Sequence, residues 1–199
     1  ASEAATRAPE LRRERFVVLS IGRFVALKGF DMTILSFATF YHSLPANEQA
    51  NAKLVLVGKG PELTKLQQLI EQHNVSESVE IIHWVERSEL SKIYQSASVF
   101  FFPSHEGAGM VVPEAMSYGV PVLCYDNFGP GEMVDVNCGR TILYSNYEHS
   151  RLLFAQQLRA LYDEPELLEA LSEGAFQKHR TQFQWACKAK IFQEAYRGL

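Results

Sequence analysis

Cysteine is scarce in this 199-residue chain, which has only Cys124, Cys138 and Cys187. An odd number of cysteines at wide spacing favours neither a disulfide framework nor a zinc site. Cys124 falls within an apolar stretch, so we expect it to be a core thiol rather than a reactive one. This cysteine usage is typical of a reducing compartment and predicts a cytoplasmic protein.

Long hydrophobic runs, basic clusters and metal-binding patterns are also missing. No apolar run is long enough to span a membrane, and we expect no signal peptide. The net charge of −4 argues against a nucleic-acid-binding surface. The chain has no Asp-x-Asp pair, and its six histidines show no ligand spacing. We therefore expect no metal site and no resident cofactor.

The composition is that of a globular protein. Apolar residues make up 47% of the chain, which is enough for a sizeable core. Residues 1–15 are polar and charged, and we interpret them as a linker or an artificial end of the chain. Residues 16–180 then form one predicted domain. Residues 181–199 form a separate C-terminal helical segment, with a helix expected over residues 185–196.

Apolar strand patterns alternate with helical patterns along the predicted domain. Helical spacing is found over residues 30–43, 148–162 and 165–179. Two further helices are expected, one with Pro61 in its first turn and one that follows a predicted N-cap at Ser88. This alternation predicts a Rossmann-like three-layer α/β/α domain with a six-stranded parallel sheet. The predicted strands are residues 16–21, 54–57, 79–84, 99–102, 120–125 and 141–144.

Several glycine-containing or polar loops come directly after predicted strands. In a parallel sheet these loops share the carboxyl edge, where ligands bind at the point of reversed strand order. Three loops of unrelated sequence are therefore expected to converge on one site. They are Gly22-Arg23, Gly58-Lys59-Gly60 and His105-Glu106-Gly107.

The most informative stretch runs from Pro103 to Gly119. It follows the apolar run of residues 99–102 and leads into a short helix that should end at Gly119. Two glycines let bare backbone approach a ligand, and the carboxylates of Glu106 and Glu114 can accept hydrogen bonds from hydroxyls. From spacing alone, an ordinary strand-to-helix turn with a polar edge explains the pattern as well as a binding site does.

This stretch resembles the signature of glycosyltransferase family 4, the retaining, nucleotide-sugar-dependent enzymes of the GT-B fold. The resemblance rests on Glu106-(seven residues)-Glu114 with its glycine loop, and on residues 115–122 after it. It continues at Gly22-Arg23 with Lys28-Gly29, at residues 57–60 and at residues 129–134, and it covers roughly residues 16 to 145. Ala108 departs from the family pattern, because an aromatic residue often stands between the two glycines.

The resemblance implies a role for each motif. Arg23 and Lys28 would stabilise the diphosphate leaving group, and Glu106 would contact the transferred sugar. Glu114 would accept hydrogen bonds from the ribose, which argues against reading the two glutamates as a glycosidase pair. Trp84 could stack on the base, although a core position is more usual for tryptophan. The remaining residues expected to bind the nucleotide sugar are Gly22, Gly58, Lys59, Gly60, His83, Val85, Gly107, Ala108, Gly109, Met110 and Val111.

The resemblance also predicts the larger enzyme. The chain would be the C-terminal half of a GT-B enzyme, which transfers a sugar from a UDP- or GDP-linked donor with retention. An N-terminal domain, absent from this sequence, would supply the site for a glycan, lipid-linked or small-molecule acceptor. Peripheral membrane association would act through that domain, and the C-terminal helix would cross back to it. Two alternatives stay open: a GT-B phosphorylase or epimerase, and a non-catalytic module that senses nucleotide sugars.

Overall fold

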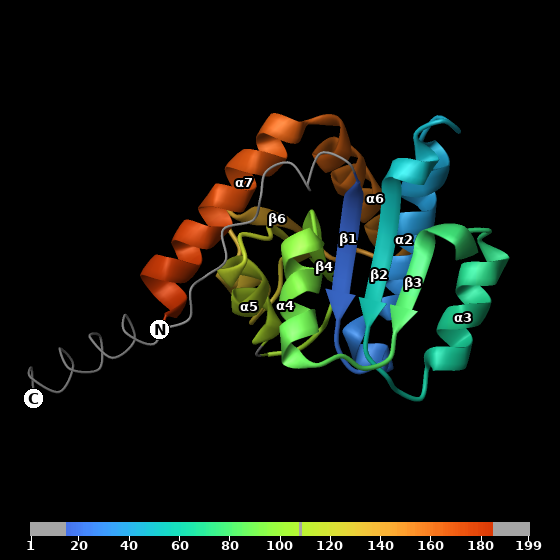
Figure 1. Cartoon of the computed structure of the whole chain (residues 1–199), viewed down its shortest axis with the longest axis horizontal. Coiled ribbons are helices and arrows are strands. Elements are labelled where there is room, and N and C mark those ends of the chain that lie inside the picture. The colour runs from blue at the N-terminus through green and yellow to red at the C-terminus, as the bar shows by residue number, and fades with distance from the viewer. Residues whose placement is uncertain (1–14, 108, 185–199) are drawn as a thin grey trace, which may run out of the picture.

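The protein is described by a computed structural model that covers residues 15–107 and 109–184. Within these residues, six strands form one sheet of order β3-β2-β1-β4-β5-β6 (Figure 1). Every neighbouring pair of strands is parallel. The predicted α/β class and six-stranded parallel sheet are therefore confirmed. The strands are β1 Phe16–Ile21, β2 Ala52–Val57, β3 Val79–Ile82, β4 Val99–Phe102, β5 Val122–Tyr125 and β6 Gly139–Ile142.

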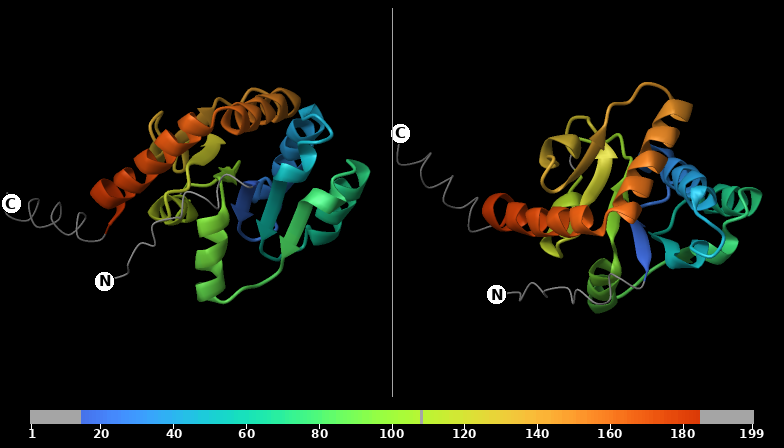
Figure 2. Two further views of the ribbon diagram at one scale, coloured as in Figure 1. Left: turned by 45° about the horizontal axis from the view of Figure 1, so that its top comes forward. Right: turned by 90° about the horizontal axis from the view of Figure 1, so that it is seen from above.

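Helices cover both faces of this sheet. The helices α2, α3 and α6 lie on one face, and α4 and α5 lie on the other, as the three views show (Figures 1 and 2). The helix α7 contacts α5 and α6 and so joins the two sides. The helices are α2 Phe30–Ser43, α3 Leu63–Gln72, α4 Arg87–Ser96, α5 Val111–Ser117, α6 Tyr147–Asp163 and α7 Pro165–Lys178.

The central strands are apolar throughout because both of their faces are covered. In β1, Phe16 and Val18 belong to the core beneath α2 and α6, whereas Val17 and Leu19 belong to the core beneath α4 and α5. This alternation follows from the two-residue period of a strand. The strand β4 is fully buried along its length. Cys124 is buried and free, as predicted, and Cys138 is also buried and free.

Several predicted boundaries need correction. The N-cap of α4 is Glu86, so Ser88 lies inside the helix. The helix α3 begins at Leu63, so Pro61 precedes it rather than opening it. The edge strands β3 and β6 end at Ile82 and Ile142, two residues before their predicted ends. An edge strand pairs on one side only, so its last residues lack the second neighbour that would extend the ladder.

The C-terminal segment is described only in part. A π-helical turn, His179–Phe183, follows α7. The helix predicted over residues 185–196 and Cys187 lie outside the described residues, as do residues 1–14 of the predicted linker, residues 1–15.

Gly58 is the position where the carboxyl edge of the sheet most requires a glycine. Its φ is 154°, and a Cβ there would overlap the carbonyl oxygen of Gly22. We expect Gly58→Ala to lower the free energy of unfolding by about 1–3 kcal/mol, because the loops after β1 and β2 must move apart. Chemical denaturation of the purified chain measures this loss.

Gly107→Ala is the matched control for that substitution. A Cβ on Gly107 would meet no heavy atom within 4 Å, and its φ is not positive. The control should change stability by less than about 0.5 kcal/mol. Equal losses for the two variants would contradict the steric account of Gly58.

Candidate functional site

The site lies where the order of the strands reverses. Strand β1 pairs with β2 on one side and with β4 on the other, and the chain leaves β1 and β4 at the same edge. In open parallel sheets such a reversal leaves a crevice beyond the carboxyl ends of the strands. The loops after β1, β2, β3 and β4 surround this crevice.

Backbone hydrogen bonds tie the first of these loops together. The N–H of Phe24 donates to the carbonyl of Lys59 at 3.0 Å, and the N–H of Glu62 donates to the carbonyl of Phe24 at 3.2 Å. The N–H of Gly58 donates to the carbonyl of Ile82 at 2.8 Å. The loop after β2 is therefore bonded both to the loop after β1 and to the end of β3.

A cavity of about 670 Å³ opens between these three loops. It gathers eight of the predicted binding residues and adds Ile21, Val57 and Leu90, which the sequence did not suggest. The eight predicted residues are Gly22, Arg23, Gly58, Lys59, Gly60, His83, Trp84 and Val85. Of the three loops expected to converge, Gly22-Arg23 and Gly58-Lys59-Gly60 therefore line one cavity, whereas His105-Glu106-Gly107 does not line it.

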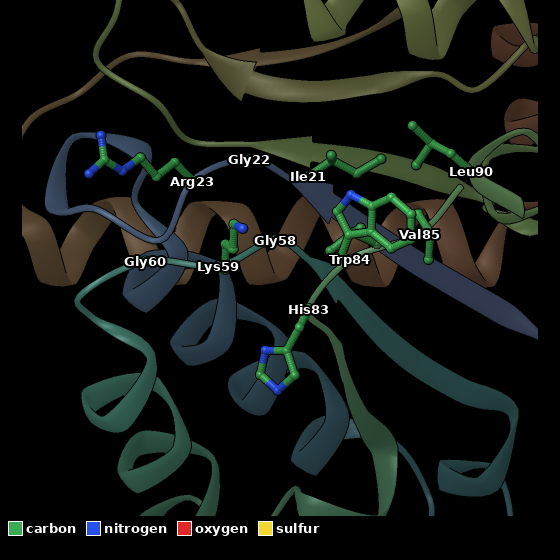
Figure 3. A pocket seen from close by; sticks show the side chains of 11 residues that line it. Ile21, Gly22, Arg23, Gly58, Lys59, Gly60, His83, Trp84, Val85 and Leu90 are labelled. Atoms are coloured by element: carbon green, nitrogen blue, oxygen red, sulfur yellow. The ribbon is translucent and has the colours of Figure 1, made fainter. Parts of the chain in front are cut away.

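The cavity has an apolar end and a cationic end. Trp84, Val85 and Leu90 lie together at one end, whereas Arg23 and Lys59 lie toward the other (Figure 3). The side chain of Trp84 is exposed, at 68% of its full accessibility. Of the two alternatives for Trp84, the core position is therefore excluded. Because β3 ends at Ile82, Trp84 falls in the connection to α4 and faces the cavity instead.

Lys28 and Glu106 meet across the reversal point. The Lys28 ammonium group forms an ion pair with the Glu106 carboxylate, and each side chain is about one-fifth exposed. The ammonium also lies 5.2 Å from the centroid of the Phe102 ring. Nearby, the N–H of His105 donates to the carbonyl of Leu27 at 3.1 Å. The sequence assigned Lys28 and Glu106 to separate tasks, but it gave no sign that they pair, since 78 positions separate them.

The glycine loop leads into the short helix α5. Gly109 is buried and has a φ of 53°. Met110 is 64% exposed, and Val111 after it is the first residue of α5. Ala108 lies outside the described residues. Glu114 is exposed in the first turn of α5, and the helix ends at Ser117 rather than at Gly119.

Tyr94 in α4 is a neighbour of Glu114 that sequence reasoning missed. Burial raises the pKa of the Tyr94 hydroxyl well above its usual value, and the negative charge of Glu114 raises it further. Its position in the sequence, within an ordinary amphipathic helix, carries no signal of a site.

The described residues contain neither a metal-binding cluster nor a membrane-spanning helix. No group of three or more His, Cys, Asp or Glu side chains in residues 15–107 and 109–184 could hold a metal ion. No helix in the described part of the chain is long and apolar enough to cross a membrane.

The chain also matches a known protein family. The family described as "Glycosyl transferases group 1" matches residues 2–178. The chain belongs to this family. The resemblance seen in the Glu106-to-Glu114 stretch is thereby confirmed.

Curated relatives from bacteria support the assignment to glycosyl transferases group 1. Alpha-monoglucosyldiacylglycerol synthase of Acholeplasma laidlawii is 26% identical over 167 residues, which are 83% of this chain and 39% of the relative. Lipopolysaccharide core biosynthesis glycosyltransferase LpsD of Rhizobium meliloti is 29% identical over 194 residues, which are 94% of this chain and 49% of the relative. The chain therefore spans less than half the length of these two glycosyltransferases.

Solved structures place the chain within the GT-B fold of this family. HepE from Anabaena, crystallised with UDP, matches with a TM-score of 0.78 at 20% identity, over 96% of this chain and 52% of HepE. The C-terminal domain of LpcC from Francisella tularensis matches with a TM-score of 0.75 at 16% identity, over 93% of this chain and all of that domain. The chain thus has the fold of a GT-B C-terminal domain.

The Lys28–Glu106 ion pair should contribute measurably to the stability of this domain. In a double-mutant cycle with Lys28→Met and Glu106→Gln, we expect a coupling energy of about 1 kcal/mol or more, because both groups are largely shielded from water. Urea unfolding of the single and double variants gives this coupling.

The pair Glu89–Lys92 in α4 is the control for that cycle. Its side chains are 55% and 70% exposed, so the matching cycle should give only about 0.3–0.5 kcal/mol. A Lys28–Glu106 coupling no larger than this control would mean that the two loops are not joined by the ion pair.

Proposed function

We propose that this chain is the donor-binding domain of a retaining glycosyltransferase. The complete enzyme would transfer a sugar from a nucleotide-diphosphate sugar to an acceptor in glycan biosynthesis. The observation that carries the proposal is the two-ended cavity at the carboxyl edge of the sheet, with the Lys28–Glu106 ion pair at the same edge. The UDP bound in the structure of HepE supports a nucleotide ligand of this kind.

The base would occupy the apolar end of the cavity. Trp84 and Val85 line it there, and the exposed indole of Trp84 offers a flat surface on which a base can stack. His83 provides the polar edge of the same segment. Glu114 would accept hydrogen bonds from the ribose hydroxyls, because an exposed carboxylate accepts from two hydroxyls at once.

The diphosphate would lie at the cationic end. Arg23 and Lys59 line the cavity there, and Lys28 follows on the same loop as Arg23. Breaking the bond to the sugar puts negative charge on the diphosphate, and fixed cations stabilise that developing charge. The backbone of residues 107–111 and the Glu106 carboxylate would then hold the sugar beyond the diphosphate.

Retention follows from the family's proposed route. In that route a donor phosphate oxygen accepts the acceptor's proton on the face from which the diphosphate leaves. The acceptor, a glycan, a lipid-linked molecule or a small molecule, would bind to an N-terminal domain outside this sequence. We propose that this domain also mediates any association with a membrane surface, that the enzyme is cytoplasmic, and that the donor needs no metal ion.

UDP or GDP should bind to this chain by itself and raise its melting temperature. Base, ribose and diphosphate contacts all fall within these residues, so ligand at about 100 times its dissociation constant should add roughly 2.7 kcal/mol to the free energy of unfolding. Differential scanning fluorimetry with UDP, GDP and ADP measures the shift. No shift with any of them at millimolar concentration would contradict the proposed site.

Arg23→Ala and Lys28→Ala should mainly lower the turnover rate of the longer enzyme. The charge on the diphosphate grows toward the transition state, so contacts to it act on turnover more than on the Michaelis constant for the donor. We expect a loss of roughly 10²–10³-fold for each variant in steady-state kinetics. A raised Michaelis constant with unchanged turnover would mean that these cations only hold the donor.

A further inference from the structure

Tyr94 carries a buried hydroxyl that the fold itself does not use. The residue lies in α4 and is 0% exposed, within the core beneath α4 and α5. Its hydroxyl oxygen is buried without a full hydrogen bond, and the group that faces it is the Glu114 carboxylate. A buried hydroxyl without a partner is costly, so a phenylalanine would satisfy the core better. The hydroxyl therefore needs an explanation other than packing.

The Tyr94 ring lies against the side of α5 that carries Glu114. It stacks on the Tyr118 ring with a centroid distance of 5.0 Å and an interplanar angle of 5°. Tyr118 caps α5 and follows Glu114 by four positions, so the two residues share one side of the helix. The Tyr118 hydroxyl is already bonded to the Ser91 hydroxyl at 2.9 Å, whereas the Tyr94 hydroxyl is available.

The same side of α4 also borders the cavity. Leu90, one turn before Tyr94, lines the cavity in which the nucleotide would bind. Burial raises the pKa of Tyr94, and Glu114 raises it further through its negative charge and a hydrogen-bonding contact with the hydroxyl, which places the carboxylate beside that hydroxyl. Tyr94 is thus positioned behind Glu114, on the core side, while Glu114 itself is exposed.

We propose that Tyr94 is a positioning residue for Glu114. Its hydroxyl donates a hydrogen bond to the Glu114 carboxylate and holds it while that carboxylate accepts hydrogen bonds from the ribose. A carboxylate has about four acceptor positions, so one donor from the protein leaves room for both ribose hydroxyls. A rigid, buried donor restricts the glutamate side chain before the ligand arrives, so less conformational entropy is lost on binding. The inference rests on the proposed function, because it assigns Glu114 to the ribose.

The test compares two ligands and two conservative variants of this chain. UDP and 2′,3′-dideoxyuridine diphosphate are titrated by calorimetry into the wild type, Tyr94→Phe and Tyr118→Phe. Tyr94→Phe keeps the ring stack and removes only the hydroxyl. Tyr118→Phe removes the other hydroxyl of the same stack, which is bonded to Ser91 and not assigned to the site.

We expect Tyr94→Phe to weaken UDP binding roughly tenfold, as the loss of one hydrogen bond to a charged group would. It should change the affinity for the dideoxy ligand less than about twofold, because that ligand makes no ribose contact for Glu114 to orient. Tyr118→Phe should affect both ligands equally. Thermal melting without ligand checks that Tyr94→Phe remains folded.

Each contrary result has a distinct meaning. Equal UDP affinity in Tyr94→Phe and the wild type would overturn the positioning role and leave the proposed function standing. Equal weakening of both ligands would make the hydroxyl a part of the fold and also overturn it. If the wild type bound neither ligand, the proposed function itself would fail.

Discussion

The parallel pairing of β1 with β2 and β4 is the constraint on which the site depends. Because β1 lies between them, the loops after all three strands emerge at one edge of the sheet. The helices that follow β1 and β4 cover opposite faces, so the order of the strands reverses between them. The cavity lies between the loops after β1, β2 and β3, and the Lys28–Glu106 ion pair joins the loops after β1 and β4.

The loops are stiffened by contacts among themselves. The loop after β1 is bonded to the loop after β2 through Phe24, and to the loop after β4 through Leu27. In the loop after β4, the His105 ring stacks on the Tyr125 ring with a centroid distance of 4.7 Å, and Tyr125 packs on Phe154 of α6. An edge fixed in this way loses little conformational freedom when a ligand binds, which is the physical basis of preorganisation.

The ion pair gives the proposed site an internal link. Lys28 is assigned to the diphosphate and Glu106 to the sugar, yet the two groups neutralise each other across the reversal point. A diphosphate that approaches Lys28 competes with Glu106 for the ammonium group. On the proposed function, the arrival of the diphosphate would free the carboxylate to accept hydrogen bonds from sugar hydroxyls.

The sequence by itself determined the fold class, the order of strands and helices and most of the residues at the carboxyl edge. Apolar runs and helical periods are local patterns, and the Glu106-to-Glu114 motif lies within one loop and one helix. Tertiary structure alone decided the rest. Trp84 is exposed because an edge strand stops before it. The Lys28–Glu106 pair depends on a contact between loops that are distant in the sequence. The position of Tyr94 depends on the packing of α4 against α5. These features come from long-range contacts, which no local pattern encodes.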